Sequence, residues 1–121
     1  MTRDVVALLA TAPDVHDVAA ALLAAGERFR VRSAAGGAVV QLCDDQGRPL
    51  VSIEVPVLVR VPGEVERLLG DRVAGAPAPP LWWVETRAPG NREGAERLGR
   101  RFAETLAERC RGVVWPPEAE P

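Results

Sequence analysis

Three short strand-like segments separated by tight turns most constrain the fold of this chain. In the first of them, apolar residues and arginines alternate with a period of two, as in a half-buried strand: Arg28, Phe29, Arg30, Val31, Arg32. Gly36-Gly37 supplies the positive-φ positions of a hairpin turn, and Asp44–Gly47 supplies a second turn. These signals predict an antiparallel meander over residues 27–33, 38–43 and 50–55.

Two segments carry the apolar spacing of a helix. The first is predicted over residues 15–25, between an N-capping Asp14 and Gly26. The second begins after Asn91, a predicted N-cap, and ends at Gly112. It carries a continuous apolar stripe: Ala95, Leu98, Phe102, Leu106 and Cys110. A shorter helix is predicted over residues 64–69, before Gly70.

The remaining segments complete an α-β-β-β-α-β-α-β order. Strands are predicted over 81–87 and 113–115, and the period of two resumes at 57–61 after Pro56. Residues 71–80 form a Pro/Ala-rich loop, 116–121 a frayed tail, and 3–10 fit either a helix or a strand. We therefore predict one α+β domain over 1–121, a two-layer sandwich with helices on one face of a mostly antiparallel sheet.

Composition narrows the class of protein. The 121 residues hold 15 basic residues, every one an arginine, against 17 acidic ones, for a net charge of −2. This balance excludes a basic nucleic-acid coat and a disordered polyelectrolyte. Arginine without lysine is typical of a GC-rich bacterial genome. No stretch reaches the length of a membrane span and no secretory leader is evident, so we expect a cytoplasmic protein.

No motif predicts catalysis, a metal or a cofactor. The single histidine, His16, lies between two aspartates in a first helical turn and is predicted to be solvated. Cys43 and Cys110 lack metal-site spacing, so we expect two reduced thiols, with one disulfide as the alternative. Asp44-Asp45 reads as a turn, and no GxSxG, GxGxxG or P-loop pattern occurs.

The strand pleat gathers the candidate partner-binding residues on one sheet face. Consecutive tryptophans cannot both enter the same core face, so Trp83 is expected on the face opposite Trp82. The predicted face carries Trp83, Arg28, Arg30, Arg32, Glu54, Glu85 and Arg87. Such a face is either solvated, with cross-strand ion pairs, or a binding surface, because tryptophan and arginine are enriched in interfaces.

These observations favour a small non-enzymatic binding or accessory protein that acts through this face, by self-association or with a protein partner. The alternative is a small enzyme or ligand-binding domain whose pocket between sheet and helices uses Glu54, Glu85 and arginines. Nucleic acid is disfavoured, because the face offers only one or two aromatic rings and the chain is slightly acidic.

Overall fold

The computed structural model describes residues 2–26, 28–70, 73–92 and 94–117. In chain order its elements are β1 (Thr2–Leu9), α1 (Val15–Ala25), β2 (Arg30–Ala34), a 3₁₀ turn η1 (Ala35–Gly37), β3 (Val39–Cys43), β4 (Pro49–Glu54), β5 (Val57–Val59), α2 (Glu64–Leu69), β6 (Leu81–Pro89), α3 (Ala95–Arg109) and β7 (Val113–Trp115). The predicted order is present, and β1 and β5 are added to it.

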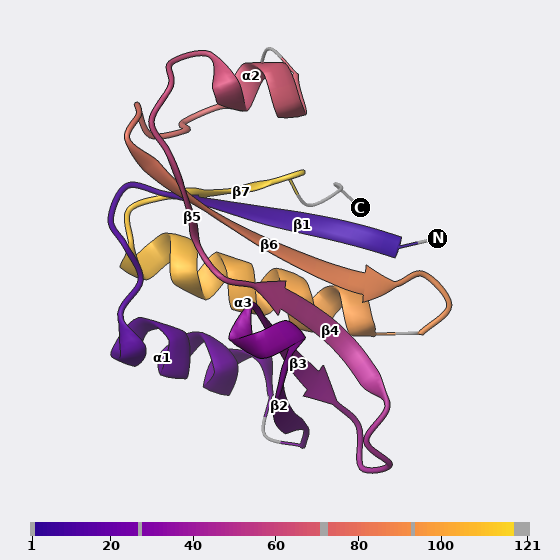
Figure 1. Ribbon diagram of the computed structural model, residues 1–121. Helices are drawn as coiled ribbons and strands as arrows, with labels where there is room; N and C mark the ends of the chain where they lie inside the picture. Colours follow the sequence, from indigo (N-terminus) through magenta and orange to yellow (C-terminus); the bar gives the residue numbers. More distant parts are fainter. Residues whose placement is uncertain (1, 27, 71–72, 93, 118–121) are drawn as a thin grey trace.

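The strands form one antiparallel sheet in the order β2-β3-β4-β6-β1-β7, with β5 also paired to β6 (Figure 1). The long strand β6 pairs with β1 along one edge and with β4 and then β5 along the other. This arrangement confirms the predicted α+β class. It also shows that residues 3–10, which fit either a helix or a strand in sequence, form a strand, β1, between β6 and the edge strand β7.

Strand β1 gives no alternating signal because both of its faces are buried. Val5, Ala7 and Leu9 belong to the main core, whereas Val6 and Leu8 belong to a smaller cluster on the opposite face. A strand covered on both sides reads as a continuous apolar run, which periodicity alone cannot separate from a helix.

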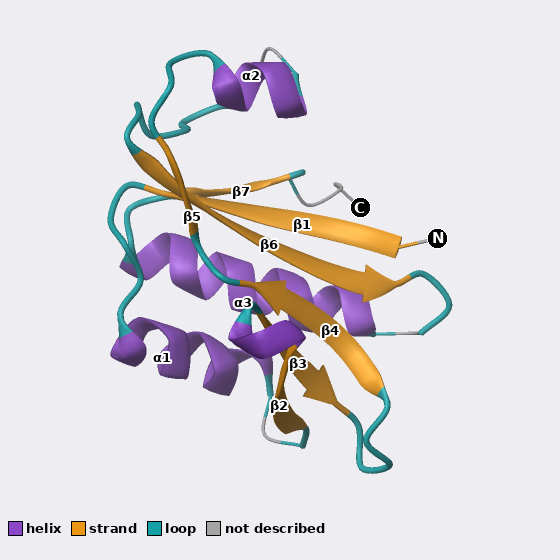
Figure 2. Ribbon diagram, viewed as in Figure 1, coloured by secondary structure: helices purple, strands orange, loops and turns teal. Residues whose placement is uncertain are grey.

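The two long helices cover one face of the sheet (Figure 2). From α3, Phe102 and Leu106 are buried in the main core against β1, β4 and β6. The short helix α2 differs from the prediction, because its Val65 packs on the opposite face with Val6 and Leu8. Helices α1 and α3 therefore share one face of the sheet, as predicted, whereas α2 lies on the other face. No helix within the described ranges is long and apolar enough to cross a bilayer.

Two predicted elements begin three residues later than expected. Helix α3 begins at Ala95 with Gly94 as its N-cap, not after Asn91, because β6 runs on to Pro89 and a turn must follow it. Strand β2 begins at Arg30, so Arg28 precedes it, and Glu27 lies outside the described residues. As predicted, Gly36 and Gly37 have positive φ angles, 66° and 92°, and lie in the loop of residues 35–38 that joins β2 to β3.

Gly112 lies closer to a neighbouring strand than any other described glycine. A Cβ at this position would lie 2.1 Å from the carbonyl oxygen of Leu8. The Gly112 N–H donates to the carbonyl of Ala107 at 2.8 Å, which fixes the exit from α3 into β7. Only glycine leaves room for β7 to reach β1 here.

We predict that Gly112→Ala lowers the free energy of unfolding by about 2–4 kcal/mol, because β7 must move away from β1. Urea denaturation measures the loss. Gly63→Ala is the control, since its site is open and the cost there is only the positive φ of 88°, about 1–2 kcal/mol. Equal losses in the two variants would contradict the steric account.

Candidate functional site

A polar row crosses five strands on the sheet face opposite α1 and α3. Backbone register aligns one residue from each strand: Arg32, Gln41, Ser52, Arg87 and Asp4. Arg32 Nη2 donates to Gln41 Oε1 at 2.7 Å, and Arg87 Nε donates to Asp4 Oδ1 at 3.3 Å. Most of these side chains are therefore hydrogen-bonded to a neighbour in the row.

Neighbouring positions on β4 and β6 hold the two candidate acidic residues, Glu54 and Glu85, and the candidate tryptophan, Trp83. Glu85 lies two residues from Arg87 and accepts a hydrogen bond from Arg87 Nη2 at 2.9 Å. Glu54 is exposed at the end of β4, and Trp83 lies beyond Glu85 on β6, opposite Val57. The pleat thus carries Trp83, Glu85 and Arg87 on one face of β6, as the alternation predicts.

Trp83, Glu54 and Glu85 line a broad hollow of about 590 Å³ between the sheet, β5 and α2. We call this site the Trp83 hollow. Its lining is Glu54, Val57, Leu58, Val59, Arg60, Val61, Glu64, Leu68, Trp83 and Glu85. Val57, Val61 and Leu68 are each more than half exposed. The hollow therefore combines apolar walls with charged residues.

Helix α2 covers Trp83 in part. The indole packs against the small cluster that contains Val65 of α2, together with Val59 and Leu81, yet the side chain remains only half-buried. Trp82 points to the opposite face and packs against the main core. Sequence reasoning separated the two tryptophans, but it had no signal for α2 as the cover of Trp83.

Three of the four predicted arginines, Arg28, Arg30 and Arg32, lie away from this hollow. Arg30 and Arg32 lie on β2, which pairs only with β3 and forms an edge of the sheet. Strands β3 and β4 separate them from β6, and Arg28 precedes β2 altogether. Charged residues on an edge strand discourage pairing with another strand. Of the seven predicted residues, three line the Trp83 hollow and Arg87 adjoins it through Glu85.

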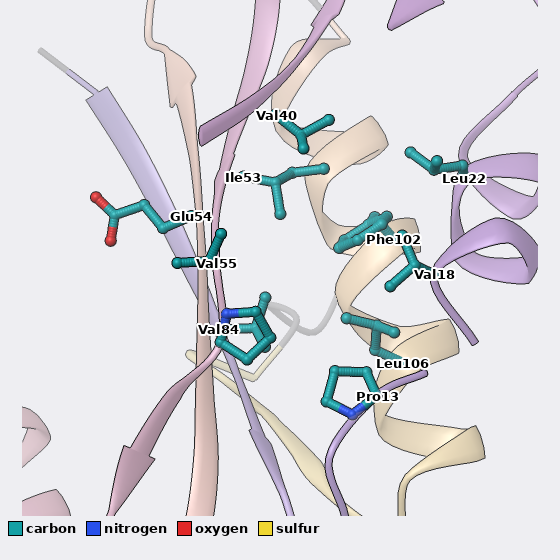
Figure 3. A pocket seen from close by; sticks show the side chains of 11 residues that line it. Pro13, Val18, Leu22, Val40, Ile53, Glu54, Val55, Val84, Phe102 and Leu106 are labelled. Atoms are coloured by element: carbon teal, nitrogen blue, oxygen red, sulfur yellow. The ribbon is translucent and has the colours of Figure 1, made fainter. Parts of the chain in front are cut away.

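A second, smaller cavity of about 200 Å³ lies between the sheet and the helices (Figure 3). Val18 and Leu22 of α1 face Ile53 across it, and Phe102 and Leu106 belong to its α3 wall. The Glu54 carboxylate points away from this cavity in Figure 3, and Glu85 does not line it. The cavity therefore presents carbon surfaces, without a side chain that could transfer a proton.

The titratable groups outside the Trp83 hollow form contacts within the fold, are buried, or lie in solvent. Asp17 caps α1 reciprocally with Asp14, and its pKa is lowered by the backbone N–H of Asp14 and by Arg109, whose Nε lies 2.8 Å away.

Cys43 and Cys110 are buried free thiols, and burial raises the pKa of Cys110. His16 is exposed. No cluster of three metal-ligating side chains occurs among the residues that the structure describes.

Asp44 organises the β3–β4 turn. Its Oδ1 accepts hydrogen bonds from the backbone N–H groups of Gln46 and Arg48, each at 2.9 Å. Its Oδ2 accepts from Arg92 Nη2 at 2.9 Å and so ties the turn to the loop before α3. The backbone bond from Arg48 and the Arg92 guanidinium lower the pKa of Asp44 from 3.8 to about 2.

The chain was compared with protein-family models, curated proteins and solved structures, and nothing matched in any of the three comparisons. The geometry of the surface is therefore what bears on function.

We predict that acid unfolding depends on Asp44. Because its pKa is lower in the folded chain, the carboxylate stabilises the fold above pH 3.8, and this contribution is lost as the pH falls towards about 2. Asp44→Asn should therefore flatten the fall in unfolding free energy over this range, as followed by urea denaturation at several pH values. Asp45→Asn, at the exposed neighbour, is the control; an unchanged slope in Asp44→Asn would contradict the assignment.

Proposed function

We propose that this protein is a non-enzymatic binding domain that takes a protein partner in the Trp83 hollow. The observation that carries the proposal is the exposed apolar wall of the hollow, formed by Val57, Val61 and Leu68 around a half-buried Trp83. Exposed apolar patches rimmed by polar residues mark interaction surfaces, and tryptophan is enriched among residues that dominate binding energy.

The charges around the hollow favour binding over catalysis. The Glu85 carboxylate is paired with Arg87 and that of Glu64 with Arg67, and each pair lies at the surface. The one buried polar side chain in the described core, Thr86, donates a hydrogen bond to the carbonyl of Val5. Groups held by neutralising partners at the surface suit a polar interface rim better than acid–base chemistry.

The rim also indicates the chemistry of the partner. Glu54 and Arg60 both line the hollow, both are exposed, and neither makes an ion pair with any other described residue. In the partner, a basic side chain would neutralise Glu54 and an acidic one would neutralise Arg60, while an aliphatic or aromatic side chain would fill the space against Trp83. We therefore propose a segment with an apolar anchor flanked by one basic and one acidic residue.

Selection from a random peptide library tests this proposal directly, because the library samples apolar and charged residues in every order. Peptides enriched on the intact domain should carry an apolar anchor beside one basic and one acidic residue. Trp83→Ala should weaken their binding by about 30-fold or more, the loss typical of a dominant interface residue. Fluorescence anisotropy of a labelled peptide gives the dissociation constants.

A pair of valines supplies the matched control. Val57 in the hollow and Val31 on β2 are both 54% exposed strand residues. Val57→Ser should weaken the same peptides by about fivefold, because about half of the value of fully burying a valine is left to gain in the complex, whereas Val31→Ser should leave them unchanged. Peptides that bind Val57→Ser and Trp83→Ala as tightly as the unaltered domain would refute the proposal, as would a selection that enriches none.

A further inference from the structure

The core of this domain is incomplete between α1 and the sheet. Helix α1 packs mainly on α3, and the space that it leaves towards β3 and β4 is the cavity of about 200 Å³ (Figure 3). Val18 and Leu22 of α1 line this space from one side and Val40 of β3 lines it from the other, yet each of the three is only half-buried. Side chains that face the core thus remain partly in contact with solvent.

The floor of the cavity lies deep in the domain. Val84 of β6 and Phe102 and Leu106 of α3 line it, and each is at most 2% exposed. The exposed part of the lining is residues 54–56, where β4 ends and the chain bends towards β5, so the cavity opens at this bend. A molecule that enters there would be enclosed by two helices and three strands, as small-molecule sites enclose their ligands.

The chemistry of the lining limits what can fill the cavity. Glu54 is the one ionisable residue of the lining, and its carboxylate points away from the space. A polar group placed inside would give up its hydrogen bonds to water and find no side-chain partner. Apolar cavities hold water poorly for the same reason, whereas the burial of an apolar molecule is favourable. The part of an occupant that enters must therefore be uncharged and apolar.

The volume limits the size of that occupant. A cavity of about 150 Å³ lined by Leu, Ile and Phe binds benzene. The cavity beside α1, at about 200 Å³, has room for such a ring with a small substituent. The Trp83 hollow is larger, carries charged residues and has walls that are more than half exposed, so it suits a protein segment better than a single ring.

We propose that the cavity beside α1 is a binding site for a small, uncharged, apolar molecule of the size of a substituted benzene ring. The bound molecule takes the place of missing core side chains, with α1 on one side, β3 and β4 on the other, and Phe102 at the floor. Because α1 packs mainly on α3, the molecule also links α1 to the sheet. The site lies on the sheet face opposite the Trp83 hollow, and the proposal does not rest on the proposed function.

Titration with toluene, followed through the methyl signals of the domain by NMR, tests the site. Toluene should bind with a dissociation constant of about 1 mM or tighter. It should shift the signals of Val18, Leu22 and Val40, whereas those of Val57 and Leu68 in the Trp83 hollow should stay in place. Absence of binding, or larger shifts in the hollow than in the cavity, would overturn the proposal.

Benzoate is the matched ligand control, because it carries a carboxylate where toluene carries a methyl group. The lining of the cavity offers this charge no partner, so benzoate should bind at least about tenfold more weakly than toluene. Benzoate that binds as tightly as toluene would show that the site does not select apolar molecules, and the proposal would be wrong.

Filling the cavity from within gives a second test. Val40→Phe and Val18→Phe add a ring from opposite walls, so each should weaken toluene binding by about tenfold or more, because the new side chain occupies the space of the ligand. Val31→Phe is the matched control, since it makes the same change at an exposed valine outside the cavity and should bind toluene normally. Undiminished binding in both filled variants would contradict the assignment, provided that their NMR spectra show the native fold.

Thermal unfolding gives an independent readout. Toluene at five times its dissociation constant should raise the melting temperature by about 4 °C, and Val40→Phe should remove this rise. Methyl signals of Val18 and Leu22 that respond to protein concentration and not to toluene would overturn the proposal in favour of a side chain from a second copy. Failure of toluene binding leaves the Trp83 hollow standing, and failure of the peptide selection leaves the cavity standing.

Discussion

The pairing of β1 with β6 along their whole length holds the fold together. Eight residues of β1 pair with β6, and three of them also pair with β7. Apolar side chains leave this ladder on both faces, to α3 on one side and to the cluster under α2 on the other. Both candidate sites depend on this ladder. The Trp83 hollow lies where the pairing partner of β6 changes from β4 to β5. Helix α1 packs on the rest of the molecule mainly through α3, and Val84 of β6 belongs to the floor of the cavity beside α1.

The sequence was most informative where periodicity is strong. It predicted α1 within its observed bounds, the three-strand meander, and the opposite orientation of Trp82 and Trp83. It did not resolve β1, because a strand buried on both faces loses alternation. It also grouped Arg28, Arg30 and Arg32 with Trp83, since a pleat shows which face a residue occupies but not how many strands separate two residues. The role of α2 beside Trp83 depends on long-range packing, which short-range patterns do not encode.

The sequence predicted helix α1 correctly but did not indicate that much of its apolar surface is exposed. Helical spacing identified α1, but an apolar stripe found in a sequence is normally assigned to the core. The structure buries only Ala21 and Ala25 and leaves Val15 and Leu23 in solvent. The polar row that begins at Arg32 shows the opposite behaviour, because exposed side chains there bond to one another across strands. Accessible apolar area, and not the density of charge, thus locates the proposed binding sites on this molecule.

The central claim is that this small domain carries two separate binding sites, the cavity beside α1 for a small apolar molecule and the Trp83 hollow for a protein segment. Amide hydrogen exchange with each ligand in turn tests both sites by one measurement. The account predicts that toluene raises the protection of residues 15–25 more than that of residues 57–61, and that a selected peptide does the reverse. Protection at 15–25 that does not change with toluene, or the same pattern of protection with both ligands, would contradict it.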